Sequence, residues 1–97
     1  MAKYRLSNVA RVDLIRIHHY GVKMFGMSQA DKYFNSFFEC FAMIADQPYS
    51  FESVDFIKNG YRRFVCGSDS IYYKMNDDGI VEIITIVGKQ DLDNIFE

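Results

Sequence analysis

Apolar side chains in the N-terminal half recur at the spacing of an α-helix, on one face of two successive segments. Ser7 can cap the first helix, and Gly26 can end it. Ser28 and Asp31 match a capping box at the start of the second helix, which must end before Pro48. The short glycine-containing connection predicts an antiparallel helical hairpin. The two apolar faces comprise Ala10, Leu14, Ile17, Gly21 and Met24, and then Ala30, Tyr33, Phe34, Phe37, Phe41, Ile44 and Ala45.

The second half of the chain changes to the short apolar runs of β-strands. Asn59 and Gly60 mark the turn that precedes them, and Gly79 can take the positive φ that a hairpin turn needs. The last run is almost continuously apolar, which predicts a strand in the middle of the sheet with both faces covered. The strand candidates are "KYRL" near the N-terminus and then "YRRFV", "IYYKM" and "IVEIITIV".

This order of elements, β-α-α-β-β-β, predicts an α+β fold in which the N-terminal strand and the helical hairpin pack on an antiparallel sheet. The 97 residues suffice for one core, and no repeat or linker divides them, so we expect a single domain over residues 1–97. No apolar run is long enough to cross a bilayer, and the N-terminus lacks the apolar region of a signal peptide. We therefore expect a cytoplasmic protein without a membrane partner.

Charge and aromatic content both indicate a protein partner. The net charge is −2, whereas proteins that hold nucleic acid through its phosphates usually carry a basic excess. We therefore expect no direct nucleic-acid binding. Seven Tyr and nine Phe are more than a small α+β domain can bury deeply. They predict an exposed aromatic and aliphatic groove that a partner covers.

The cysteines and histidines do not form a recognisable metal or catalytic site. Cys40 lies among phenylalanines and Cys66 lies on a strand candidate, so both are expected to be buried, inert thiols. A disulfide between them is an alternative, which a reducing compartment disfavours. His18 and His19 are adjacent and point about 100° apart on a helix, so they cannot chelate one metal together. We expect no metal and no cofactor.

Two residue pairs on the predicted strands alternate between the faces of the sheet. One of Arg62 and Arg63 should face solvent, and the other could hold a carboxylate or phosphate in its fork. Two ordinary edge charges are an equally good interpretation. For Tyr72 and Tyr73, alternation predicts one ring in the core and the other partly exposed.

Two long stretches, "FGMSQADKYFNSFFECFAMIADQP" and "GYRRFVCGSDSIYYKMNDDGIVEIITIVGKQD", together resemble the ParE toxins of the RelE/ParE superfamily. The resemblance implies the toxin of a bacterial type II toxin–antitoxin module, of the kind that stabilises plasmids or chromosomes. It also implies a ParD-like antitoxin whose extended or helical tail wraps the groove of the toxin. ParE-like members of the superfamily poison DNA gyrase, whereas RelE-like members cut mRNA within the ribosome.

The tail "VGKQDLDNIF" separates these two activities. It is similar to the RelE tail as far as Lys89 and then departs, with Gln90 where that family has arginine and Phe96 where it has tyrosine. Glutamine cannot neutralise phosphate charge, and phenylalanine has no proton to give. The strand near Ser70 also lacks the arginine of the nucleases. The tail therefore predicts no catalytic residue and no enzyme activity.

The resemblance implies a gyrase inhibitor that acts by protein–protein binding. Asp69 stands where many ParE members have histidine, which leaves two alternatives open. One is a RelE-like ribosome-dependent mRNA interferase, and the other is a degenerate binding module without toxicity. The candidates for target contact are Lys89, Gln90, Asp91 and Phe96 in the tail, with Arg62, Arg63 and Lys74 as secondary candidates.

Overall fold

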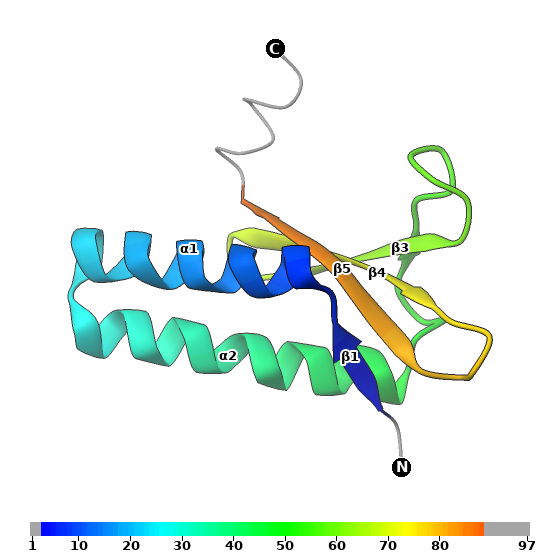
Figure 1. Cartoon of the computed structure of the whole chain (residues 1–97), viewed down its shortest axis with the longest axis horizontal. Coiled ribbons are helices and arrows are strands. Elements are labelled where there is room, and N and C mark those ends of the chain that lie inside the picture. The colour runs from blue at the N-terminus through cyan, green and yellow to red at the C-terminus, as the bar shows by residue number, and fades with distance from the viewer. Residues whose placement is uncertain (1–2, 89–97) are drawn as a thin grey trace.

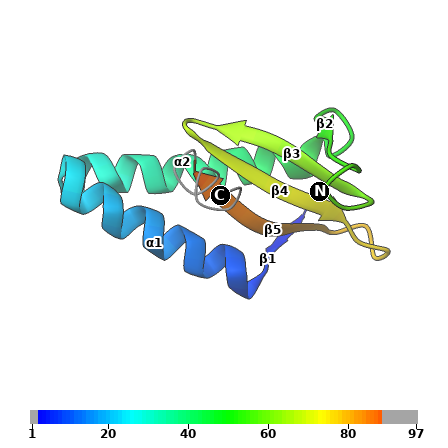
Figure 2. The ribbon, with the colours of Figure 1, turned by 90° about the horizontal axis from the view of Figure 1, so that it is seen from above.

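The computed structural model describes residues 3–88, which form two layers, a helical hairpin and a sheet (Figures 1 and 2). Helices α1 and α2 run antiparallel, as predicted from the glycine connection. Within the described residues the sheet has five strands in the order β1-β5-β4-β3-β2. The elements are β1 (Tyr4–Leu6), α1 (Asn8–Phe25), α2 (Met27–Asp46), β2 (Glu52–Ser53), β3 (Tyr61–Cys66), β4 (Asp69–Met75) and β5 (Val81–Gly88).

The α+β prediction is confirmed, with two differences in the sheet. Strand β1 pairs parallel with β5, so the sheet is mixed rather than purely antiparallel. The two-residue strand β2 lies in a segment that reads as a loop, and it pairs with β3 through Glu52 and Arg63. Strand direction and two-residue strands leave no periodic signal in the sequence, because both depend on residues far along the chain.

The predicted cap of α1 is confirmed, but the capping box of α2 is wrong. The Ser7 Oγ accepts a hydrogen bond of 3.0 Å from the Ala10 amide. Helix α2 begins at Met27, and its N-cap is Gly26, which has no side chain to offer. The Asp31 carboxylate instead lies 2.8 Å from the Nε2 of His18 on α1. A contact between the two helices has replaced the local cap.

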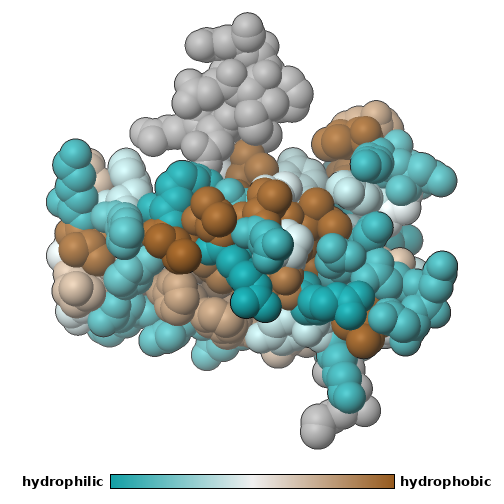
Figure 3. Space-filling model, viewed as in Figure 1, coloured by the Kyte–Doolittle hydropathy of each residue, from teal (hydrophilic) through white to brown (hydrophobic). Residues whose placement is uncertain are grey.

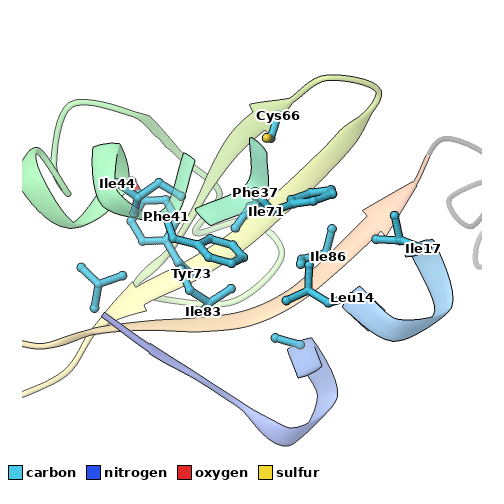
Figure 4. Packing of buried hydrophobic residues seen from close by; sticks show 12 residues of the cluster. Leu14, Ile17, Phe37, Phe41, Ile44, Cys66, Ile71, Tyr73, Ile83 and Ile86 are labelled. Carbon is cyan, nitrogen blue, oxygen red and sulfur yellow. The ribbon is translucent and has the colours of Figure 1, made fainter. Parts of the chain in front are cut away.

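Aromatic rings along α2 form the centre of the core (Figure 4). The ring centroids of Tyr33 and Phe37 lie 5.1 Å apart, and those of Phe37 and Phe41 lie 6.3 Å apart. Phe41 in turn meets the ring of Tyr4 on β1 at 5.4 Å. These four side chains form an aromatic ladder that runs from one end of the hairpin to the first strand. Burying each such ring contributes roughly 1.5–3 kcal/mol.

Both tyrosines of the pair on β4 are buried, so the prediction that one ring is partly exposed is wrong. Tyr73 is 0% exposed in the main core, and its hydroxyl donates a 2.7 Å hydrogen bond to the Pro48 carbonyl. Tyr72 is 8% exposed in a second, smaller cluster with Val54 and Val87. The sequence did not reveal this because Val54 comes from the connection before β3, which has no helical or strand-like period.

The prediction of two separate thiols is also wrong, because Cys40 and Cys66 form a disulfide. Cys40 lies on the face of α2 that packs on the sheet, and Cys66 ends β3 on the side that faces the helices. Their Cα atoms are 6.4 Å apart although 26 positions separate them in the sequence. Only the packing of α2 across β3 brings them together. The described helices are also too short or too polar to cross a membrane.

Strand β1 covers only the first part of the outer edge of β5. It pairs with Val81–Ile83, and beyond that point the chain turns into α1. Ser7 continues the ladder, because its amide donates to the Ile83 carbonyl at 3.0 Å. The Ser7 hydroxyl donates to the Ile84 carbonyl at 2.7 Å. One residue therefore caps α1 and also extends the pairing of β5.

Side chains of α1 satisfy the rest of this edge. The Asp13 carboxylate accepts hydrogen bonds from the Ile86 amide at 3.0 Å and from the Thr85 hydroxyl at 2.6 Å. A nitrogen of Arg16 lies 3.5 Å from the Ile86 carbonyl and 3.5 Å from Asp13. We call this set, with Ser7, the polar seal of β5. It satisfies backbone groups that a neighbouring strand would otherwise pair.

We expect Asp13→Ala to lower the free energy of unfolding by about 1–3 kcal/mol, because it leaves the partly buried Ile86 amide without its acceptor. Thr85→Val removes only the hydroxyl bond and should cost less, about 0.5–1.5 kcal/mol. Asp77→Ala, in the exposed turn before β5, is the control. Urea unfolding followed by circular dichroism measures all three. Equal stability of the Asp13 and Asp77 variants would rule out a structural role for the seal.

Candidate partner-binding groove

A groove of about 660 Å³ opens between the helical hairpin and the ends of β4 and β5. Helix α1 supplies one side of it, the N-terminal part of α2 supplies the floor, and the β3–β4 turn supplies the opposite wall. Its lining combines apolar rings with a few polar groups, as is typical of a site that holds another molecule. The lining residues are Arg16, Ile17, Tyr20, Gly21, Phe25, Gln29, Ala30, Tyr33, Ser68, Asp69 and Gly88.

Small residues shape the helical side of the groove. A Cβ atom added to Gly21 would lie 3.2 Å from the Cβ of Ala30, so the two helices approach closely here. The larger side chains beside them remain uncovered, with Tyr20 48% exposed and Phe25 68% exposed. Exposed rings that gather beside a hollow form a surface of the kind that binds a partner. The predicted aromatic groove is therefore present, and its coverage by a partner remains a prediction.

The opposite wall is held to α2 by Tyr33. Its hydroxyl accepts a 3.2 Å hydrogen bond from the Ser68 amide and donates to the Asp69 carboxylate. The Cys66 carbonyl lies 3.3 Å from the same hydroxyl, which has one hydrogen and gives it to the stronger, charged acceptor. Gly67 has φ 64°, and a Cβ there would lie 2.7 Å from the Tyr33 ring. The turn thus needs glycine at this position.

Tyr33 holds this wall in place through hydrogen bonds and is poorly suited to give up its proton in a reaction. Burial raises the pKa of Tyr33, and the hydrogen bond to Asp69 raises it further. The phenol therefore stays neutral well above neutral pH and keeps its donor role. Neither Tyr33 nor Asp69 was a candidate from the sequence, because only the packing of the β3–β4 turn on α2 brings them together.

Arg62 and Arg63 point to opposite faces of the sheet, as alternation predicts, and both are already engaged. The Arg62 guanidinium donates to the Phe51 carbonyl at 2.7 Å and lies 5.4 Å from the centre of the Tyr49 ring. It borders a second, smaller pocket of about 350 Å³. Arg63 donates to the Glu52 carboxylate at 2.6 and 3.0 Å, and these bonds raise the pKa of Arg63. The carboxylate that this fork holds is therefore one of the chain itself.

Lys74 lies in register with Tyr61 on β3 and with Glu82 on β5. The alternation of the strand puts it on the same face as Arg63, away from the helices. None of the secondary candidates lines the large groove. The tail candidates Lys89, Gln90, Asp91 and Phe96 lie outside the described residues.

A second apolar surface runs along the outside of α1, where brown side chains gather in the middle of Figure 3. Another apolar patch lies at the tip of the loop between β2 and β3, which projects from the sheet. Both patches lie outside the groove, and the sequence gives no separate signal for either. Among residues 3–88, no group of three or more His, Cys, Asp or Glu side chains could hold a metal ion. The exposed apolar residues of these two patches are Val9, Val12 and Ile15 on α1, and Phe56 and Ile57 in the loop.

Residues 4–93 match the family model for the ParE toxin of the type II toxin–antitoxin system parDE, which is almost the whole chain. The chain belongs to the ParE toxin family. Toxin ParE1 of Caulobacter vibrioides is 34% identical over 88 residues, which are 90% of this chain and 88% of that protein. Toxin ParE1 of Mycobacterium tuberculosis is 25% identical over 86 residues, which are 89% of this chain and 88% of that protein.

The fold agrees with this assignment. A chain in a solved structure of the chromosomal ParDE system of P. aeruginosa superimposes with a TM-score of 0.79 at 17% identity. The match covers 91% of this chain and 96% of that one. This ParE toxin is thus the toxin of a type II toxin–antitoxin system, which implies an antitoxin protein as its partner.

Tyr73, which borders the smaller pocket, gives a prediction for alkaline pH. Burial raises the pKa of Tyr73 from 10.0 to about 12. The unfolded chain loses this proton first, so the stabilisation is complete below pH of about 10 and is lost as the pH rises towards 12. In an ultraviolet titration of the folded protein, we expect a last tyrosinate step near pH 12 that Tyr73→Phe removes. Tyr49→Phe, at an exposed ring, is the control and should leave that step in place.

Proposed function

We propose that this ParE toxin acts by binding DNA gyrase, not by catalysis, and that a ParD-like antitoxin neutralises it by filling the large groove. The observation that carries the proposal is the family match over residues 4–93. Gyrase acts on the chromosome, so we place the action of the toxin in the cytoplasm. The contacts of the cationic side chains support action by binding, and the groove supports neutralisation by an antitoxin.

The cations and phenols of the described residues support binding over RNA cleavage. Cleavage of RNA needs a proton acceptor, a proton donor and free positive charge at the phosphate. Arg62 holds a backbone carbonyl and Arg63 holds Glu52, so both forks are occupied. Tyr33 and Tyr73 have raised pKa values and hydrogen-bond to groups of the chain itself. In the tail, Gln90 and Phe96 lack the charge and the proton of the nuclease residues.

The groove suits a protein segment with apolar side chains. Its exposed rings, Tyr20 and Phe25, offer contact area on the rim, while Gly21 and Ala30 leave room between the helices. A helix or an extended strand that lays one apolar face into such a groove gains most of its affinity from a few anchors. The polar end, with Asp69 and Arg16, would set its direction.

The candidates for gyrase contact are the tail residues Lys89, Gln90, Asp91 and Phe96, with Arg62, Arg63 and Lys74. Arg63 and Lys74 share the sheet face that is turned away from the helical hairpin. The Arg63 side chain is 34% exposed, so it can contact a partner on this face while it stays paired with Glu52.

A gyrase supercoiling assay with the purified toxin tests the proposed target. We expect loss of supercoiling and accumulation of cleaved DNA, because a bound protein traps the enzyme while the DNA is cut. Lys89→Ala should weaken inhibition, and Lys32→Ala on the exposed side of α2 should leave it unchanged. Undiminished supercoiling at a clear molar excess of toxin would reject gyrase as the target. Fresh mRNA ends at ribosomal A sites would favour an interferase, and harmless expression without antitoxin would indicate a degenerate module.

Binding of the antitoxin encoded beside the toxin gene tests the groove. We expect Phe25→Ser to weaken binding by about tenfold or more, because a bound segment would cover this large exposed ring and a few such rings carry most of the affinity of an interface. Phe56→Ser removes a ring that is 82% exposed in the loop before β3, outside the groove, and is the matched control. Isothermal titration calorimetry measures both. Equal affinities for the two variants would place the antitoxin elsewhere on the toxin.

A further inference from the structure

The disulfide between Cys40 and Cys66 fastens the wall of the groove to α2. Cys66 ends β3 and is followed directly by Gly67, Ser68 and Asp69, the turn that forms that wall. Figure 4 shows Cys66 at this end of the hairpin, above Phe37 of α2. Cys66 is therefore two positions from Ser68, the nearest residue of the groove lining in the sequence, although neither cysteine lines the groove.

Two fastenings hold this turn to α2, and they differ in kind. Tyr33 holds it through hydrogen bonds to Ser68 and Asp69, and Cys40 holds it covalently through Cys66. Tyr33 and Cys40 are seven positions apart on α2, so they lie on the same face, two turns apart. When the covalent fastening opens, the wall depends on the hydrogen bonds alone.

The two cysteine residues differ in exposure, and this difference favours attack at Cys40. Cys66 is 3% exposed and lies in the core, whereas Cys40 is only partly buried. We therefore expect a thiolate from outside to attack the Sγ of Cys40, with Cys66 as the departing sulfur. The Cys66 Sγ lies 3.9 Å from the Ser36 carbonyl, which can accept a weak hydrogen bond from the thiol once it forms. The core therefore offers the Cys66 thiol a hydrogen-bond acceptor after reduction.

We propose that the Cys40–Cys66 pair is a reversible thiol–disulfide site. Through it, the redox state of the cell sets how often the groove wall opens away from α2. The co-reactant is a dithiol. Its first thiolate attacks Cys40, the sulfur–sulfur bond breaks, and the Cys66 thiolate takes up a proton. Its second thiolate then attacks the mixed disulfide and releases Cys40 as a thiol. Two electrons and two protons pass to the pair, and the dithiol leaves as a disulfide.

This site adds control by oxidation to a surface that the proposed function assigns to the antitoxin, but it does not depend on which protein fills the groove. In the oxidised form the turn is tied at two points and the wall is fixed. In the reduced form the turn opens more often, because the open arrangements of the chain between the two cysteines, which are 26 positions apart, are no longer restricted. When the wall opens in this way, the affinity of the groove for a bound ligand should change.

Amide hydrogen exchange of the full chain, before and after reduction with dithiothreitol, tests the proposal. The readout is the Ser68 amide, which donates to Tyr33. We expect it to exchange about tenfold or more faster in the reduced protein, since local opening loses a covalent restraint. The amide of Leu14, in the core of α1, should change much less. A thiol count confirms that dithiothreitol has released both cysteines.

Cys40→Ala is the matched variant, since it removes the bond at the more exposed sulfur and leaves the buried Cys66 in place. It should exchange at Ser68 like the reduced wild type and should no longer respond to dithiothreitol. Ser68 exchange that is equal in the oxidised and reduced wild type would overturn the proposal. So would a disulfide that dithiothreitol cannot open in the folded protein. The wild-type comparison decides the matter even if the variant folds poorly.

Discussion

The aromatic ladder along α2 is the contact on which the other features depend. Phe37 and Phe41 fix the hairpin against the sheet, and Tyr33 continues the same line beyond the main core. Because the rings contact one another along one helix, the position of Tyr33 depends on the packing of Phe37 and Phe41. Tyr33 is one of the two attachments of the groove wall to α2, so the packing of the core also positions the groove.

The groove exists because the packing changes along the hairpin. Where Phe37 and Phe41 fill the space between helix and sheet, no hollow is left. Further towards the hairpin turn, Gly21 and Ala30 bring the helices close to each other and leave the sheet unfilled. Bulky rings at one end and small residues at the other therefore divide the hairpin into a part that holds the fold and a part that can receive a partner.

The sequence predicted what depends on neighbours along the chain. The apolar faces of both helices, the Ser7 cap and the Gly79 turn were correct apart from Met24, which is 54% exposed, since each rests on residues a few positions apart. What it missed joins distant segments. Asp31 does not cap its own helix but contacts His18 on α1, and Cys40 on α2 forms a disulfide with Cys66 on the sheet. The groove was predicted from the excess of aromatic residues, but its wall at Tyr33 and Asp69 required the fold.

The polar seal of β5 has a consequence for the toxin when it is free of its antitoxin. A bare strand edge invites another copy to add a strand, and repeated addition leads to fibrils. Asp13 and Ser7 occupy the amide and carbonyl groups that such stacking would use. Strand addition by a second copy of the toxin along this edge is thereby disfavoured, which leaves the released molecule open to contact with a different protein.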